Sequence, residues 1–458
     1  MRTTTLFLMA GLLAVGPALA GKLDKKEFKA AQKKAAAAMS QGADDVLATA
    51  LTELGADDSK KAVDFILKVA VTNSAGVVYN AARQALAGMS SDEAVDHMVK
   101  KVEKRGDPRL KLLLIDSFAD RDDAETGAAL GAALESREPE VLRAAVQAIG
   151  KRQPKDAVEG LIDLFEKLQK GRASDGLLMN TVQETLYKLT GQSYEDPADW
   201  RKWWTVQKAN FRPKTGGHAP KHGGTVLRKK VPTFFGSEIK SNRIVFVIDT
   251  SGSMTAEDPA PPTPPKTGGP PTRKGPKTGD DGSRSNGKDG KDGDADEEDN
   301  EPPKSPSRIR VERAKFQLKH VINALPQGAM FTIVGFDTNT KIFSPKLMAA
   351  TPANKTKAEA FVMGLNPSGT TMTLKAAEAA FDVEGADTII LLSDGFPTEV
   401  DKDDNNRQLT PEEVADKITE LNRFKRWRID TFGFKATGMM NFMKRLADQN
   451  SGEYTDIP

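Results

Sequence analysis

The chain is 458 residues long, has 28% charged residues and carries a formal net charge of +2 at neutral pH. This length is enough for two or three domains, and the balanced charge is typical neither of a nucleic-acid-binding protein nor of a protein with an acidic tail. The sequence contains no cysteine, which excludes disulfide bonds, zinc–thiolate sites and lipid attachment at a lipobox.

The N-terminus has the pattern of a secretory signal peptide. Arg2 precedes an apolar stretch from Leu6 to Val15, and an Ala-x-Ala site ends at Ala20. This pattern predicts that residues 1–20 are removed on export to the periplasm or the exterior. The apolar stretch is shorter than the ~20 residues needed to span a bilayer, and we expect no membrane span elsewhere in the chain.

Residues 21–205 have the periodicity of successive amphipathic helices. Aliphatic residues recur at three- and four-residue intervals, and matching positions recur about every 32 residues, at Leu54, Leu86, Phe118 and Ile149. Such a period predicts helix pairs that stack into an α-solenoid of four or five repeats. The repeats resemble HEAT-type repeats, although the period is short. An irregular helical domain is the alternative interpretation.

The helical region ends in a tryptophan-rich segment, 199–204, which predicts a capping helix with its indoles packed on the last repeat. Residues 206–233 are basic and rich in glycine and proline, which predicts a flexible linker. Because aromatic residues are not interleaved with its positive charges, we expect no nucleic-acid partner.

An apolar strand, Ile244–Ile248, ends in the run Asp249-Thr250-Ser251-Gly252-Ser253. One carboxylate and two hydroxyls alternate along this turn, so their oxygens can point at one spot. Hard oxygen ligands of this kind suit Mg²⁺, Mn²⁺ or Ca²⁺. A polar strand-end turn that binds no metal is the alternative.

Two later segments bear on this choice. The run Pro367–Thr371 precedes an alanine-rich helix, and the apolar strand Thr388–Leu392 leads into Ser393-Asp394-Gly395. Taken separately, Thr371 could be a helix N-cap and Asp394 a turn residue. Taken in order, the three segments resemble the von Willebrand factor A domain with its metal-ion-dependent adhesion site, over residues 234–458. The pairing with helical repeats resembles exported bacterial proteins that contain both modules.

The resemblance implies a five-residue metal site at the carboxyl edge of a doubly wound α/β sheet. Its members would be Asp249, Ser251, Ser253, Thr371 and Asp394. Thr370 remains an alternative to Thr371, because the local sequence departs from the family's usual Gly-Gly-Thr. The resemblance also implies that the hydroxyls lie nearest a divalent cation, with Mg²⁺ expected and Mn²⁺ or Ca²⁺ as alternatives. The partner would be a protein that presents a carboxylate to the cation.

Alternating strands and helices over the C-terminal half predict the doubly wound sheet independently of the motif. The expected helices are Arg310–Leu325, Thr373–Phe381, Pro411–Asn422 and Met439–Ala447. The expected strands besides Ile244–Ile248 and Thr388–Leu392 are Met330–Phe336, Arg428–Gly433 and Gly452–Thr455.

Residues 255–308 form an insertion in this domain. The segment has no Leu, Ile, Val, Met or aromatic residue, so it cannot bury a core and we expect it to be disordered. One hypothesis is that a carboxylate from its acidic half, 289–301, occupies the metal site in cis. An inert solvated loop is the alternative.

No catalytic machinery is evident in the sequence. The serine-containing run does not match the G-x-S-x-G nucleophile elbow. Of the four histidines, His97 and His320 lie in helical patterns, whereas His218 and His222 lie in the linker. The sequence therefore predicts a non-enzymatic binding protein that uses the metal site, with the helical repeats as a second binding platform. The alternative is a scaffold in which the solenoid binds partners and the metal only stabilises the sheet domain.

Overall fold

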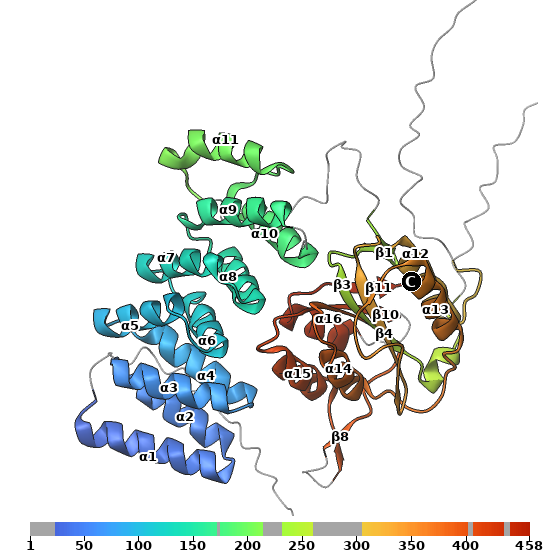
Figure 1. The fold of residues 1–458 in the computed structure, drawn as a ribbon. Helices are drawn as coiled ribbons and strands as arrows, with labels where there is room; N and C mark the ends of the chain where they lie inside the picture. The colour runs from blue at the N-terminus through green and yellow to red at the C-terminus, as the bar shows by residue number, and fades with distance from the viewer. Residues whose placement is uncertain (1–22, 172–174, 214–230, 260–304, 402–405, 435–439) are drawn as a thin grey trace, which may run out of the picture.

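The computed structural model describes residues 23–171, 175–213, 231–259, 305–401, 406–434 and 440–458. The chain forms two parts that lie side by side (Figure 1). The first is a stack of helices over residues 25–211, which we call the solenoid. The second is an α/β domain over residues 233–457, which we call the sheet domain. The predicted signal peptide, most of the predicted linker and the acidic half of the insertion lie outside the described residues.

The solenoid consists of five helix pairs and a closing helix. The pairs are α1 (Lys25–Gln41) with α2 (Asp44–Gly55), α3 (Lys60–Thr72) with α4 (Gly76–Gly88), α5 (Asp92–Glu103) with α6 (Pro108–Phe118), α7 (Ala124–Ala132) with α8 (Pro139–Arg152), and α9 (Ala157–Lys170) with α10 (Gly176–Thr190). The four recurring positions Leu54, Leu86, Phe118 and Ile149 lie on α2, α4, α6 and α8 and are fully buried. The predicted helical solenoid is therefore confirmed, because each repeat buries its marker against its neighbours.

Polar contacts between repeats recur at nearly the same spacing. The Asp58 carboxylate accepts a hydrogen bond from the Ser91 amide at 2.7 Å, 33 residues along the chain. Arg121 donates to the Ala87 carbonyl at 2.9 Å, 34 residues back. These contacts satisfy backbone groups at the helix ends, which would otherwise lack partners. They also fix the stagger of one repeat on the next.

The closing helix α11 (Pro197–Gln207) carries the tryptophans of the predicted cap. Trp200 and Trp204 are buried in the solenoid core and Trp203 packs against it, which confirms the packing expected of this helix. A short 3₁₀ turn follows α11, and Phe211 is buried beside Trp204 with ring centroids 5.2 Å apart. Packed structure therefore continues beyond residue 205 into the expected linker.

The sheet domain is built on seven strands in the order β11-β10-β7-β3-β4-β5, with β6 pairing with β4. These strands are β3 (Arg243–Asp249), β4 (Met330–Phe336), β5 (Thr340–Ile342), β6 (Met348–Ala349), β7 (Thr388–Ser393), β10 (Arg428–Phe434) and β11 (Tyr454–Ile457). The strands from β11 to β4 run parallel, whereas β5 and β6 pair with β4 antiparallel. A hairpin, β1 (Thr233–Phe234) with β2 (Ser237–Glu238), precedes the sheet.

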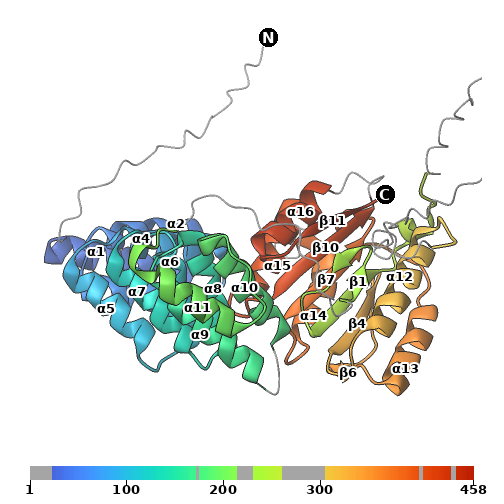
Figure 2. The same cartoon turned by 90° about the horizontal axis from the view of Figure 1, so that it is seen from above.

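Helices cover both faces of the sheet, so its central strands are apolar on both sides. Alternate residues of β3 belong to two separate cores: Phe246 packs with α12 (Arg310–Ala324) and α13 (Pro352–Met363). Val245 packs on the other face with α14 (Thr373–Phe381), α15 (Pro411–Asn422) and α16 (Met440–Gln449). Figure 2 shows these two helical layers on either side of the strands. The predicted doubly wound fold is confirmed.

Most predicted elements agree with the structure, and the exceptions have local causes. The last strand is β11 (Tyr454–Ile457), two residues later than expected. Gly452, just before it, lies directly against the backbone of Ile429, where a Cβ would clash. Helix α13 and the short strands β1, β2, β5 and β6 were not predicted. Nor was the small hairpin of β8 (Val400–Asp401) and β9 (Arg407–Gln408). Its strands are two residues long, which is too short for an alternating pattern.

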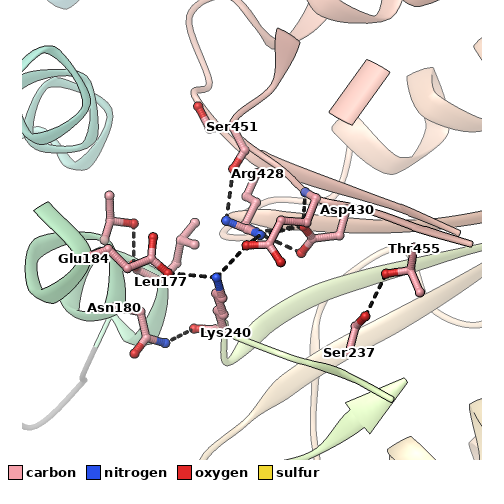
Figure 3. Close-up of polar contacts among 11 residues, drawn as sticks. Leu177, Asn180, Glu184, Ser237, Lys240, Arg428, Asp430, Ser451 and Thr455 are labelled. Atoms are coloured by element: carbon pink, nitrogen blue, oxygen red, sulfur yellow. Dashed lines mark hydrogen bonds and ion pairs between the residues drawn. The ribbon is translucent and has the colours of Figure 1, made fainter. Parts of the chain in front are cut away.

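The solenoid docks on one edge of the sheet, where the parallel strands begin. We call this the amino edge. In Figure 3, Lys240, just before β3, donates to Glu184 of α10 at 2.8 Å, and its carbonyl accepts from Asn180 at 2.6 Å. Further along, Arg426 ahead of β10 pairs with Asp116 of α6 at 2.5 Å. The helices α4, α6, α8 and α10, each the second of its pair, contact the sheet domain. The opposite edge of the sheet lies away from the solenoid (Figure 1).

Candidate metal site at the carboxyl edge of the sheet

Two neighbouring parallel strands end together at the edge of the sheet remote from the solenoid, which we call the carboxyl edge. β3 ends at Asp249 and β7 ends at Ser393, with Ile248 directly opposite Leu392. The turns that follow these strands hold Ser251, Ser253 and Asp394. Because both strands run in the same direction, residues predicted from segments more than 140 positions apart meet at one point.

A third loop is fastened to this point by backbone hydrogen bonds. The amide of Ser368 donates to the Thr250 carbonyl at 2.8 Å, and the amide of Gly252 donates to the Gly369 carbonyl at 3.1 Å. Gly369 has a φ of +64° and lies against Thr338, so a side chain here would be both strained and obstructed. The glycine therefore lets this loop bring Thr371 beside the β3 turn.

The five predicted residues come together at this point. The hydroxyl oxygens of Ser251 and Ser253 are 3.0 Å apart, and Ser253 donates to Asp394 Oδ1 at 2.6 Å. A Cβ built on Gly395 would lie 2.6 Å from Thr371 Oγ1 and 3.3 Å from Ser253 Oγ. The hydroxyls of Thr371 and Ser253 therefore lie close to Gly395, and a side chain at this position would displace them.

The two threonines left open by the sequence differ in position. Thr371 is buried beside the β7 turn. Thr370 is exposed, and its hydroxyl lies 3.2 Å from that of Thr338 on the outer side of the loop. The geometry therefore favours Thr371 as the threonine that faces the other four side chains.

Asp249 is fully buried, and neutral groups hold both of its carboxylate oxygens. The Ser251 amide donates to Oδ1 at 2.7 Å and the Ser393 hydroxyl donates to Oδ2 at 2.5 Å. Burial raises the pKa of Asp249 to about 6, and the nearby Asp394 charge adds to the rise although these hydrogen bonds oppose it. A positive charge at this point would offset the cost of ionising Asp249.

Asp394 contacts a residue that the sequence did not single out. Arg310, the first residue of α12, donates to Asp394 Oδ2 at 2.7 Å, and the carboxylate side chain is fully buried. Burial disfavours charge on the guanidinium, yet the carboxylates of Asp394 and Asp258 outweigh it and hold the pKa of Arg310 above its usual value. Arg310 is separated from both carboxylates by dozens of residues, so no local pattern could reveal the contact.

The sequence analysis also missed Asp337 and Ser393, which hold parts of the site in place. Ser393 donates to Asp249, and Asp337 holds the loop that carries Thr371. Asp337, directly after β4, accepts from the Ser368 hydroxyl at 2.8 Å and the Asn339 amide at 2.7 Å. Burial opposes ionisation, but these hydrogen bonds prevail and lower the pKa of Asp337. A strand-end signal was available for both residues, because Asp337 and Ser393 end apolar strands as Asp249 does.

The residues present fit a hard divalent cation. Three hydroxyls and two carboxylates supply only oxygen, the ligand type preferred by Mg²⁺, Mn²⁺ and Ca²⁺. The absence of a side chain on Gly395 keeps the space between Thr371 and Ser253 open. Over the described residues, no group of three or more His, Asp or Glu side chains is arranged to hold a metal, so this candidate depends on its hydroxyls.

The other sequence candidates do not join this site. His97 lies on α5 and pairs with Asp64 at 3.0 Å, and His320 lies within α12. His218, His222 and the acidic stretch proposed to bind in cis lie outside the described residues.

Comparison with known proteins identifies the C-terminal part of the chain. Residues 305–456 match the family model of the von Willebrand factor type A domain. This part of the chain is a vWA domain. The match begins after the insertion and leaves out β3 with its Asp249–Ser253 run, which the structure places in the middle of the vWA sheet. No curated protein matches the chain.

Two solved structures that match the chain illustrate the level of similarity. A von Willebrand factor type A protein from Catenulispora acidiphila is 19% identical with a TM-score of 0.31, and the match covers 47% of this chain and 38% of that one. The PilB minor pilin from Streptococcus sanguinis is 16% identical with a TM-score of 0.28, over 47% of this chain and 56% of the pilin. The match therefore covers 38% of the length of the first of these two proteins and 56% of the length of the second.

Proposed function

We propose that the protein is an exported, non-enzymatic binding protein whose vWA domain captures protein partners through a divalent cation. The cation would be held by Asp249, Ser251, Ser253, Thr371 and Asp394. The observation that carries this proposal is the gathering of three hydroxyls and two buried carboxylates at one point of the carboxyl edge.

The proportion of neutral ligands points to an acidic partner. When bound, a divalent cation supplies a positive charge that hydroxyl ligands do not neutralise, and a carboxylate from another protein can complete its shell. Mg²⁺ is the cation we expect, with Mn²⁺ or Ca²⁺ as alternatives. Hydrogen bonds within the chain orient the two carboxylates that would bind the cation. Ser393 and the Ser251 amide donate to Asp249. Ser253 and Arg310 donate to Asp394.

The surface around these donors is suited to a protein contact. Ser253, Ser368 and Thr370 are exposed beside the buried carboxylates, and Phe396, two residues after Asp394, is 49% exposed. An exposed aromatic ring next to a small polar area is typical of the residues that carry binding energy at interfaces. We infer that the partner presents an acidic residue with an apolar neighbour.

The solenoid holds the vWA domain by the edge of the sheet opposite to the proposed site. Four of its helices, α4, α6, α8 and α10, contribute Gly76, Asp116, Arg143 and Glu184 to this contact. A second partner would therefore bind to other helices of the solenoid. The alternative proposal is a scaffold in which the solenoid binds partners and the cation only stabilises the vWA domain.

Export is proposed from the signal-peptide pattern of residues 1–20. Among the helices that the structure describes, none combines the length and the apolar character needed to cross a bilayer. Intact mass measurement of the protein recovered from the periplasm or the medium tests this proposal, and a chain beginning at Gly21 is the expected product.

Capture of partners from cell-envelope and secreted fractions tests the binding function. The bait is the mature chain, in Mg²⁺ and in EDTA, with Thr371→Ala as the site variant. Thr356→Ala is the matched control, because Thr356 is an exposed threonine of α13 that bonds only its own helix in the described contacts. We expect a partner that is retained in Mg²⁺ by the wild type and the control and is lost in EDTA or with Thr371→Ala. Equal capture in all samples would instead assign binding to the solenoid.

A further inference from the structure

Arg310 occupies a position where helix stability does not call for a positive charge. It is the first residue of α12, whose N-cap, Ile309, makes no side-chain capping hydrogen bond. The N-terminus of a helix carries a partial positive charge, so an arginine there is mildly unfavourable. The contacts that compensate for this cost lie outside the helix.

These contacts are two buried carboxylates on opposite sides of the guanidinium. Nη1 of Arg310 donates to Asp394 Oδ2 at 2.7 Å and Nε donates to Asp258 Oδ1 at 2.9 Å. The side chains of Arg310, Asp394 and Asp258 are 11%, 0% and 6% exposed. Such a sheltered pair is screened far less than a surface ion pair, so the charge of Arg310 acts strongly on Asp394.

The backbone fixes Asp258 where it can hold Arg310. The amide of Asp258 donates to the Arg308 carbonyl at 3.0 Å, and the amide of Arg310 donates to the Ala256 carbonyl at 3.0 Å. The two ends of the insertion thus pair as a short antiparallel bridge beside the candidate site. Arg313, one turn further along α12, also pairs with Asp258 and donates to the Pro458 carbonyl at 2.9 Å.

We propose that Arg310 is an internal cation that competes with the divalent ion for Asp394 and thereby weakens ion binding at this site. This inference rests on the proposed metal site. Without the ion, Arg310 neutralises Asp394 next to the buried Asp249 and keeps the two carboxylates together. When the ion binds, it shares Asp394 with a guanidinium of the same sign, and the repulsion lowers the affinity. The ion is therefore held loosely.

The test measures Mg²⁺ and Mn²⁺ dissociation constants by calorimetry on the full mature chain. Arg310→Gln removes the charge but keeps a side chain of hydrogen-bonding length, and we expect both ions to bind at least tenfold more tightly. We also expect the ion-free variant to melt at a lower temperature than the wild type and to gain more in melting temperature from Mg²⁺. Arg310→Lys keeps the charge, so its dissociation constants should stay within threefold of the wild type.

Arg313→Gln is the matched control, because it removes one positive charge from the same helix and the same Asp258 cluster but not from Asp394. We expect its dissociation constants to stay within threefold of the wild type. The proposal is overturned if Arg310→Gln binds the ions no more tightly than the wild type does. It is also overturned if Arg313→Gln tightens binding as much as Arg310→Gln, because the effect would then not be specific to Arg310. If neither the wild type nor any variant binds Mg²⁺ or Mn²⁺, the metal site itself is refuted.

Discussion

The two edges of the vWA sheet differ in what their charged side chains contact. At the amino edge, basic side chains of the vWA domain pair with acidic side chains of the solenoid: Lys240 with Glu184 and Arg426 with Asp116. The contact with the solenoid is thus satisfied by the chain's own charged groups. At the carboxyl edge, Arg310 pairs with Asp394 within the vWA domain. Asp249 beside them accepts hydrogen bonds from neutral donors, and burial raises its pKa to about 6. The proposed cation would balance the charge of Asp249, which no basic side chain neutralises in the contacts described above.

The largest expected effect is at the amino edge. Asp116→Ala removes the carboxylate that accepts from both Arg426 and Tyr79. The largely buried guanidinium is left with the Tyr79 hydroxyl, to which it donates at 3.3 Å, and with no carboxylate to balance its charge. The free energy of unfolding should fall by about 2–3 kcal/mol, somewhat less than for a fully buried pair. Urea unfolding followed by tryptophan fluorescence measures this loss.

Asp116→Asn is the matched control, because an amide oxygen still accepts hydrogen bonds, and a smaller loss is expected. Mg²⁺ affinity should be the same in the wild type and in both variants. A change in affinity of more than threefold would show that the two edges are coupled across the sheet, contrary to the comparison above.

The second prediction concerns a buried carboxylate at the amino edge, Asp387, which precedes β7. Burial raises its pKa to about 6, although hydrogen bonds from Ser241 and Thr388 oppose the rise. The folded pKa lies above the unfolded value of about 3.9, so the folded state binds more protons between these values. The contribution of Asp387 to stability is therefore highest below pH 4 and falls by about 2–3 kcal/mol as the pH rises through 6.

Asp387→Asn removes this titration without changing side-chain shape. The free energy of unfolding of the wild type minus that of the variant should decrease from pH 4 to pH 7, as measured by urea unfolding at several pH values. A difference that is constant with pH would mean that Asp387 has the same pKa in both states.

Gly395 at the carboxyl edge gives the third prediction. A Cβ at this position would lie 2.6 Å from Thr371 Oγ1, so Gly395→Ala must displace that hydroxyl. We expect Mg²⁺ affinity to fall about tenfold, or roughly 1.4 kcal/mol. Gly328→Ala is the control, because a Cβ there meets no heavy atom within 4 Å in the described structure. Equal calorimetric affinities for the two variants would argue against Thr371 as a ligand.

The smallest effect is expected from Thr370→Ala. Its hydroxyl lies on the outer side of the loop beside Thr338, so Mg²⁺ affinity should change by less than twofold. Thr371→Ala should weaken binding by tenfold or more, since it removes a donor from the site. The reverse order in calorimetry would assign the site to Thr370 and place the loop differently in solution.

The sequence predicted those features that depend on local patterns. The helices with a period of 3.6 residues, the apolar strands and the Asp249–Ser253 turn are each encoded by residues that are close together in the sequence. The docking of the two domains could not be predicted, because Arg426 and Asp116 are 310 residues apart and each has an ordinary local sequence. Arg310 was missed for the same reason: it stands 84 residues before Asp394, and its position at the start of α12 carries no signal.

The opposed placement of the two edges has a mechanical consequence. A partner held at the carboxyl edge and a solenoid anchored at the amino edge would pull on the vWA domain along the direction of its strands. Tension in this direction loads the hydrogen bonds between β3, β4 and β7 in shear. In this geometry many hydrogen bonds must break at the same time, whereas in a sheet pulled open from one end they break one after another. The parallel sheet would then join the solenoid and the proposed partner as a stiff, load-resistant link.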